Sequence, residues 1–476
     1  MIRGDKMKKD FKNKALFNIA AGVLVSASAM LTAGTIQTAG AQNNETMSPE
    51  DIEFSEQFKL FVGVLKGVQK LSVEEHSYRE LAETAINAMI KVADPKATYI
   101  NKVEPLREKN LPPEQQLNYH AEMFFYVLKQ TKDLAEQNNV PGVTYTKLVE
   151  TGLKAMLRSL DPHSLYSNQT EWKAHQEELQ GEFRGIAISL SKDDGAPVKA
   201  LEVMDKTPAQ RAGVLKDDLI THIDGTPVND LDIQEVVKKL RGKPKTTVQL
   251  TVTRKDEAQP LNFTLAREII QVDPVKKRMI ETENGRIGYI KIMQFIDKVD
   301  RKVDLAIKEL ENDNGGAPSS YIIDVRNNPG GLLDQVADIA DNFLDGGMTV
   351  VTKERGGRVS GIPFTAHAGD DIHGKKLVVL TNANSASASE ILASTLKHKR
   401  PYLGDKGRAT IIGEDETTFG KGSVQRMLPT EPYGGINLTV ALYYAPEKTP
   451  QNVGVTPDIK VVLPPPTEEE LKERAK

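Results

Sequence analysis

The chain is long, slightly acidic and free of cysteine. Its 476 residues suffice for two or three domains with ordinary cores. The formal net charge of -4 argues against nucleic acid as the main partner. Because there is no cysteine, disulfides, thiol nucleophiles and cysteine metal sites are excluded.

The first forty residues have the pattern of an export signal. A basic start is followed by the uncharged stretch 15–36, and the small residues Ala39 to Ala41 offer a cleavage site. We therefore expect residues 1–41 to be a signal peptide, which would place the mature protein in the periplasm or cell envelope. The alternative is an uncleaved membrane anchor, because the uncharged stretch is long enough to span a bilayer.

The segment 48–180 is predicted to be helical and contains an internal repeat. A shift of 67 residues aligns many identical residues, among them Tyr78 with Tyr145 and Asp94 with Asp161. Each copy predicts a helical hairpin that ends at Asp-Pro, because the residue before a proline is disfavoured in a helix. We expect this region to make the protein a homo-oligomer, or to bind an adaptor or activator protein.

Short apolar strands separated by turns are predicted from residue 181 to 268. The segments Thr207 to Val214 and Asp218 to Gly225 resemble those of a PDZ domain, which binds the C-terminal end of a peptide as an added strand. The resemblance implies that backbone N–H groups of one loop hold the terminal carboxylate. That loop runs through Arg184, Gly185, Ile186 and Ala187, and Ile188 after it is a further peptide-binding candidate. Its two isoleucines imply a preference for protein or peptide substrates with apolar C-termini, and a purely structural sheet is the alternative.

The segment 272–463 alternates strands and helices, as in an α/β core. Strands are predicted at 287–295, 321–326, 377–380 and 440–444, and helices at 299–310, 332–344 and 386–396. Arg326 is expected to pair with Asp324 or with another carboxylate. The last residues, 464–476, are mostly charged and are expected to form a mobile or partner-ordered tail.

A small-residue segment, Ser385-Ala386-Ser387-Ala388-Ser389-Glu390, follows the strand at 377–380 and opens a helix. We expect Asn384 or Ser385 to cap this helix. A serine at such a place lies near unpaired N–H groups and the positive end of the helix dipole, which stabilise an oxyanion.

A serine nucleophile needs a base, and the downstream candidate is Lys421, which has a glycine on each side. A lysine serves if burial lowers its pKa enough to leave the amine neutral. Gln425, four residues further on, is expected to hold that amine in line by a hydrogen bond.

These segments together resemble the C-terminal processing peptidases, also called tail-specific proteases. The resemblance rests on Ser-Ala-Ser-Ala-Ser-Glu, on Phe-Gly-Lys-Gly-x-Val-Gln and on Asp-Val-Arg-Asn-Asn-Pro-Gly-Gly-Leu upstream. It implies that Ser387 is the nucleophile, Lys421 the base and Gln425 its support. It also implies oxyanion donors at Ala388 and at either Gly330 or Gly331, between which the sequence does not decide.

The implied protein is a multidomain α+β serine endopeptidase with a duplicated helical region, a PDZ domain and an α/β protease core. It would recognise protein C-termini through the PDZ domain and cleave with a Ser-Lys dyad, without metal or cofactor. Ser387 and Lys421 lie farther apart in the sequence than is usual in the family. A catalytically silent or partner-activated PDZ scaffold is therefore the alternative. A Ser-His-Asp triad that uses His367, His373 or His398 is formally open as well.

Overall fold

The computed structural model describes residues 48–94, 112–192, 197–255, 257–271, 273–399, 403–404, 406–445 and 451–462. The expected signal peptide 1–41, the end of the first repeat copy at 95–99 and the charged tail 464–476 lie outside the described residues. Within the described ranges, no helix combines the length and the apolar character needed to cross a membrane.

The repeat in the sequence is a repeat of helices. The N-terminal helices are α2 (Pro49–Leu71), α3 (Tyr78–Ala93), α4 (Pro113–Gln137) and α5 (Tyr145–Leu160). Helices α3 and α5 have 16 residues each and begin 67 residues apart. Ser77 and Thr144 cap them by accepting an N–H group of the first turn. Both helices end directly before an Asp-Pro pair, as predicted from proline stereochemistry.

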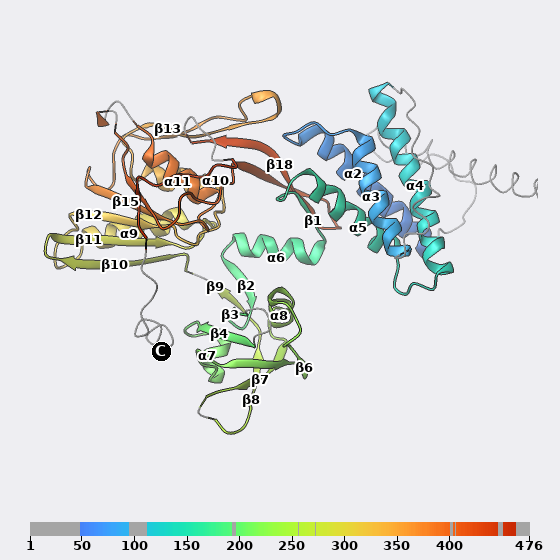
Figure 1. Ribbon diagram of the computed structural model, residues 1–476, viewed down its shortest axis with the longest axis horizontal. Coiled ribbons are helices and arrows are strands. Elements are labelled where there is room, and N and C mark those ends of the chain that lie inside the picture. Colours follow the sequence, from blue (N-terminus) through green and yellow to red (C-terminus); the bar gives the residue numbers. More distant parts are fainter. Residues whose placement is uncertain are drawn as a thin grey trace, which may run out of the picture. The chain divides into compact units, whose positions relative to one another are not determined.

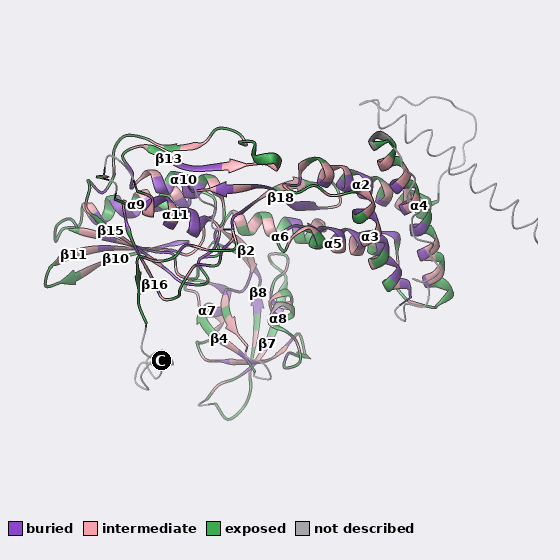
Figure 2. Cartoon of the chain, turned by 45° about the horizontal axis from the view of Figure 1, so that its top comes forward, coloured by how far each residue is buried: buried purple, intermediate pink, exposed green. Residues whose placement is uncertain are grey.

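The apolar core of these helices continues onto strand β18 (Gly435–Tyr444). Ile436, Leu438 and Val440 of β18 belong to the same cluster as the buried side chains of α2 to α5. Strand β18 is buried along most of its length (Figure 2). After α5 the chain forms β1 (Leu165–Ser167), which pairs antiparallel with β18, and then α6 (Gln169–Leu179). The helical region is therefore held on a strand whose other neighbours carry the candidate site.

The next segment is a small sheet with two short helices. Its elements are β3 (Ile188–Ser191), β4 (Val198–Val203), α7 (Pro208–Ala212), β5 (Leu219–Ile223), β6 (Thr226–Pro227), α8 (Ile233–Leu240), β7 (Thr247–Thr253) and β8 (Leu261–Ala266). The strand order is β3-β4-β5-β7-β8, with β6 on β5, and Val236 and Leu240 pack α8 against the sheet. Strands β2 (Glu182–Gly185) and β9 (Glu268–Gln271) pair with each other at the two ends of this segment. Strand β3 pairs only with β4 among the described strands, so one of its edges is open to an added strand.

The larger sheet of the C-terminal part is mostly parallel (Figure 1). Its elements are β10 (Val275–Thr282), β11 (Gly285–Ile292), α9 (Val299–Glu311), β12 (Ser320–Asp324), α10 (Leu333–Asp341), β15 (Lys376–Thr381), α11 (Ala388–Lys397), β16 (Thr410–Gly413) and β19 (Ile459–Lys460). The order is β10-β11-β12-β15-β16-β19, and only β10 is antiparallel to its neighbour. Because β12 and β15 are parallel neighbours, the loops that follow them meet at one edge of the sheet.

A second, antiparallel sheet joins the helical region to this core. It contains β1, β18, β13 (Gly347–Lys353) and β14 (Phe364–Ala366) in that order, and β17 (Ser423–Pro429) also pairs with β18. Lys421 lies two residues before β17, and Gln425 within β17 is opposite Thr439 of β18. The sheet thus brings the C-terminal catalytic candidates beside residues that follow α5.

Candidate active site

Ser387 lies at the sharp bend between β15 and α11. Its backbone has φ 55° and ψ -113°, which L-residues rarely adopt, and it is itself the N-cap of α11. The expectation that Asn384 or Ser385 caps this helix is wrong. The Ser385 hydroxyl is buried and donates to the carbonyl of Val325 at 2.8 Å, so it ties the bend to the end of β12 instead.

The turn after β12 packs directly against this bend. The carbonyl of Asn328 accepts the N–H of Ala386 at 3.0 Å and the hydroxyl of Ser389 at 2.9 Å. Gly330 has φ 102°, and a Cβ built on it would lie 2.7 Å from the Ser387 Cβ and 2.9 Å from the Ala388 nitrogen. Only glycine allows this approach between the turn and the helix start.

The two glycines of the turn differ in how their N–H groups are used. The N–H of Gly330 donates to the Asn328 side-chain oxygen at 2.9 Å. Gly331 is exposed, and the residues on either side of it bond to Phe295, so its own N–H points away from that bridge. Among the described residues, neither this N–H nor that of Ala388 has a hydrogen-bond acceptor. Two unpaired donors therefore flank Gly330 beside the serine.

Glu390 connects the bend to the segment that carries Lys421, a role that the sequence did not predict. Its fully buried carboxylate accepts the N–H groups of Ser387 (2.8 Å), Gly420 (2.7 Å) and Lys421 (2.9 Å) and the hydroxyl of Thr418 (2.5 Å). Burial raises the pKa of Glu390, and the four donors oppose that rise. In the sequence, a glutamate three residues after a serine at a helix start suggests only a capping box.

Tyr443 of β18 makes a second connection between the same two residues. Its buried hydroxyl hydrogen-bonds to the carbonyl of Lys421 and lies 3.2 Å from the carbonyl of Ser387. Glu390 thus binds the N–H groups of Ser387 and Lys421, and Tyr443 binds their carbonyl groups. Together they fix the two main chains relative to each other.

Burial lowers the pKa of the Lys421 ammonium, while the negative charges of Asp161 and Glu390 raise it. Within the described part of the chain, no hydrogen bond joins the amine to the Ser387 hydroxyl or to Gln425. The amide nitrogen of Gln425 donates instead to Ser423 (2.9 Å) and Thr439 (3.1 Å). The support of Lys421 by Gln425 therefore stays a prediction.

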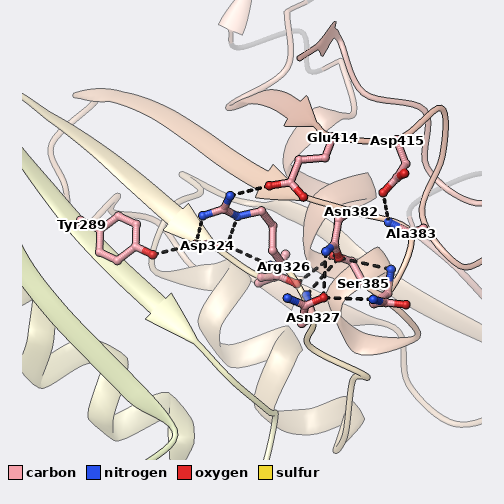
Figure 3. A network of polar contacts seen from close by, with 11 residues as sticks. Tyr289, Asp324, Arg326, Asn327, Asn382, Ala383, Ser385, Glu414 and Asp415 are labelled. Atoms are coloured by element: carbon pink, nitrogen blue, oxygen red, sulfur yellow. Dashed lines mark hydrogen bonds and ion pairs between the residues drawn. The ribbon is translucent and has the colours of Figure 1, made fainter. Parts of the chain in front are cut away.

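Arg326 pairs with both carboxylates that face it. Figure 3 shows its guanidinium between Asp324, with bonds of 2.8 and 3.0 Å, and Glu414 at 2.6 Å. The Tyr289 hydroxyl donates to the buried Asp324 at 2.7 Å, and burial with this carboxylate raises the Tyr289 pKa to about 12. Asn327, the next residue, exchanges hydrogen bonds with Asn382, so the network fixes the loop after β12 to the loop after β15.

The three histidines considered for a triad lie elsewhere. His367 is exposed and bonds to Asp341, His373 is exposed in a turn, and His398 follows the far end of α11. In the described structure none of them hydrogen-bonds to Ser387. By contrast, His163 lies close enough to Lys421 for that charge to lower the His163 pKa, in addition to the larger effect of burial.

Of the predicted carboxylate-binding loop, Arg184 and Gly185 lie in strand β2, and only Ile186 and Ala187 lie between β2 and the open-edged strand β3. Ile186 and Ala187 are buried, and their carbonyls accept the N–H groups of Ala209 and Met204. Among the described residues, the N–H groups of Ile186 and Ala187 have no acceptor. Arg184 pairs with Glu177 at 2.5 Å, and Ile188 begins β3. The geometry leaves donors of the kind that a peptide carboxylate requires.

Two family profiles match the chain. Residues 286–461 match Peptidase family S41, and residues 185–265 match the PDZ domain. A carboxy-terminal-processing protease of Bartonella bacilliformis is 40% identical over 322 residues, which cover 67% of this chain and 71% of the relative. A carboxyl-terminal-processing protease of Synechocystis is 34% identical over 320 residues, 66% of this chain and 71% of that protein.

A solved structure of a photosystem II D1 C-terminal processing protease aligns with 86% of this chain and 93% of its own, at 23% identity and a TM-score of 0.48. The expected α+β fold class is confirmed by the family and PDZ matches. The chain belongs to the carboxy-terminal-processing proteases of peptidase family S41, and is a serine-type peptidase with a PDZ domain.

Proposed function

We propose that this chain is a serine endopeptidase of the bacterial cell envelope that captures protein C-termini at its PDZ domain and cleaves with Ser387 and Lys421. The observation that carries the proposal is the double connection of these two residues through Glu390 and Tyr443. Two side chains that act on one substrate bond must be held at a fixed separation, and hydrogen bonds to both main chains provide this. The export pattern of residues 1–41 supports the envelope location, with an uncleaved anchor as the alternative.

In the proposed reaction, the neutral amine of Lys421 takes the proton of the Ser387 hydroxyl as the oxygen attacks the scissile carbonyl. The N–H groups of Ala388 and Gly331 donate to the resulting oxyanion. We assign Gly331 this part because the N–H of Gly330 is already bonded to Asn328. The carbon–nitrogen bond then breaks, and the Lys421 ammonium returns its proton to the leaving amine.

The acyl-enzyme that remains is an ester of Ser387. Water attacks this ester while Lys421 again accepts a proton, which then returns to the serine oxygen as the new carboxylic acid leaves. The absence of a direct hydrogen bond between the two side chains is compatible with this sequence, since catalytic hydrogen bonds are often long until substrate binds.

Substrate selection is assigned to the open edge of β3. A peptide tail would add as a strand there, with its carboxylate on the N–H groups of Ile186 and Ala187 and its last side chain beside Ile188. Proteins or peptides with apolar C-termini are the proposed substrates. Self-association and activation by an adaptor remain proposals for the helical region.

The test uses the full chain with a long fluorogenic peptide that ends in valine, next to the same peptide with an amidated C-terminus. We expect the parent to cleave, and Ser387→Ala and Lys421→Ala each to lose at least about 10³-fold in kcat. Amidation should raise KM. Full activity of Lys421→Ala would exclude this base, whereas a parent that binds the peptide and does not cleave it would favour activation by a partner protein.

A further inference from the structure

We propose that Asp161 is a positioning residue for the lysine half of the dyad, acting through Thr439 and Gln425. The inference rests on the proposed Ser-Lys function. It makes the segment that follows helix α5 part of the catalytic apparatus, although this segment lies outside both matched profiles.

The Asp161 carboxylate is enclosed by donors. It accepts the N–H groups of His163 (2.8 Å) and Ser164 (2.9 Å) and the Ser164 hydroxyl (2.6 Å). It also accepts the hydroxyl of Thr439 at 3.0 Å, across 278 residues of sequence. The Ser164 oxygen in turn accepts the N–H of Thr439 at 3.0 Å. The segment is therefore fixed to β18 by side-chain bonds in addition to the pairing of β1.

The chemistry of the groups determines which is the donor in the hydrogen bond between Thr439 and Gln425. An ionised carboxylate only accepts, so the single proton of the Thr439 hydroxyl points at Asp161. The lone pairs of Thr439 are then left for the Gln425 amide nitrogen at 3.1 Å, whose other hydrogen goes to Ser423 at 2.9 Å. Both N–H bonds of the Gln425 amide are thereby used.

This ordering determines which end of the Gln425 amide is available to Lys421. With the nitrogen engaged by Thr439 and Ser423, the carbonyl oxygen is the free end, which would accept an N–H of the amine when the dyad assembles around a substrate. A lysine held in this way keeps its lone pair for the serine proton. Without Asp161, the Thr439 proton would be free to rotate toward Gln425, and either orientation of the amide would become acceptable.

Asp161 also acts on Lys421 through its charge. The charged groups that affect this lysine are Asp161 beyond α5 and Glu390 on α11. His163 in the segment after α5 and the Tyr443 hydroxyl on β18 are the titratable groups nearby. Burial and the nearby lysine lower the His163 pKa, and the charge of Asp161 opposes them. Asp161 and Glu390 thus oppose the effect of burial on the Lys421 pKa.

The first experiment compares Thr439→Val, which removes the relaying hydroxyl at nearly constant shape, with Thr439→Ser, which keeps it. We expect Thr439→Val to lower kcat at least about 10-fold with little change in KM, because a small misplacement of a catalytic group costs 10- to 100-fold. Thr439→Ser should recover kcat to within about threefold of the parent. The matched control is Thr131→Val in α4, which also removes a buried hydroxyl and should leave kcat unchanged. The Thr131 residue is 2% exposed, and the Thr439 residue is 4% exposed.

The second experiment is the pH profile of Asp161→Asn, a readout that a merely structural role would not move. Loss of the negative charge lowers the Lys421 pKa, so the acid limb of kcat/KM should move to lower pH. This profile decides the matter if Thr439→Val fails to fold.

A Thr439→Val variant with parental kcat, a Thr439→Ser variant as damaged as Thr439→Val, or an unmoved acid limb in Asp161→Asn would overturn the inference. Lys421→Ala, assayed in parallel, separates the two levels of the argument. If it is active, the dyad itself is refuted. If it is inactive while Thr439→Val is unimpaired, the dyad stands and only the role of Asp161 fails.

Discussion

Replacement of Glu390 by glutamine should detach the lysine segment from the serine bend. The carboxylate accepts four hydrogen bonds, two on each oxygen. Glutamine keeps one oxygen and presents an NH₂ group to the other two donors. If this group faces Thr418 and Gly420, the Thr418 hydroxyl can rotate and accept from it, but the N–H of Gly420 is buried without an acceptor. Such a donor costs about 1–3 kcal/mol, and we expect a net local loss of about 2 kcal/mol.

A loss of this size raises the open fraction of the segment roughly 30-fold, which amide hydrogen exchange measures directly. We expect the peptides that contain Gly420 and Lys421 to lose protection in Glu390→Gln, and kcat to fall about 100-fold with a small change in KM. Glu311→Gln is the matched control, since Glu311 is a partly buried carboxylate bonded to Tyr321 and Lys375 away from the dyad. Parental exchange and kcat in Glu390→Gln would refute the connecting role.

Three further substitutions test the same region. Lys421→Met should melt at a higher temperature than the parent at pH 7 and converge with it toward pH 10. The reason is that a lysine pKa lowered by burial costs stability below the folded pKa, and this cost disappears as pH rises to the ordinary value of about 10.4. Ser387→Gly should be about 1 kcal/mol more stable than Ser387→Ala in thermal unfolding, because glycine accepts φ 55° without strain; equal stabilities would contradict the strain argument. Arg326→Gln leaves the buried Asp324 without its cation and should lower the free energy of unfolding of the core by about 2–4 kcal/mol. The companion variant that also carries Asp324→Asn should recover part of this loss in the same denaturation assay, and no recovery would count against the ion pair.

Much of the fold follows from local sequence. Proline stereochemistry fixed the ends of α3 and α5, and the apolar run before the serines predicted β15. The position of Gly330 is also legible, because an Asn-Pro-Gly-Gly turn before a helix supplies backbone donors. The sequence pattern could not show that the N–H of Gly330 donates to the Asn328 side chain. This hydrogen bond leaves the N–H of Gly331 as the available donor for an oxyanion. The prediction of the helix cap was wrong for a similar reason. The Ser385 hydroxyl donates to the carbonyl of Val325, which lies 60 residues away in the sequence.

The sequence by itself determined the peptidase family of this protein and named the candidates for its chemistry, which are Ser387, Lys421 and the glycine turn. Only the tertiary structure decided how these groups are held. Glu390 reads locally as a helix cap and Tyr443 as a strand residue, yet both bind the serine and lysine main chains together. In the sequence, the position of Asp161 indicates only the end of a helix. In the structure, its carboxylate accepts a hydrogen bond from Thr439, 278 residues further along the chain. Such hydrogen bonds depend on distance in space, and local propensity and periodicity contain no information about that distance.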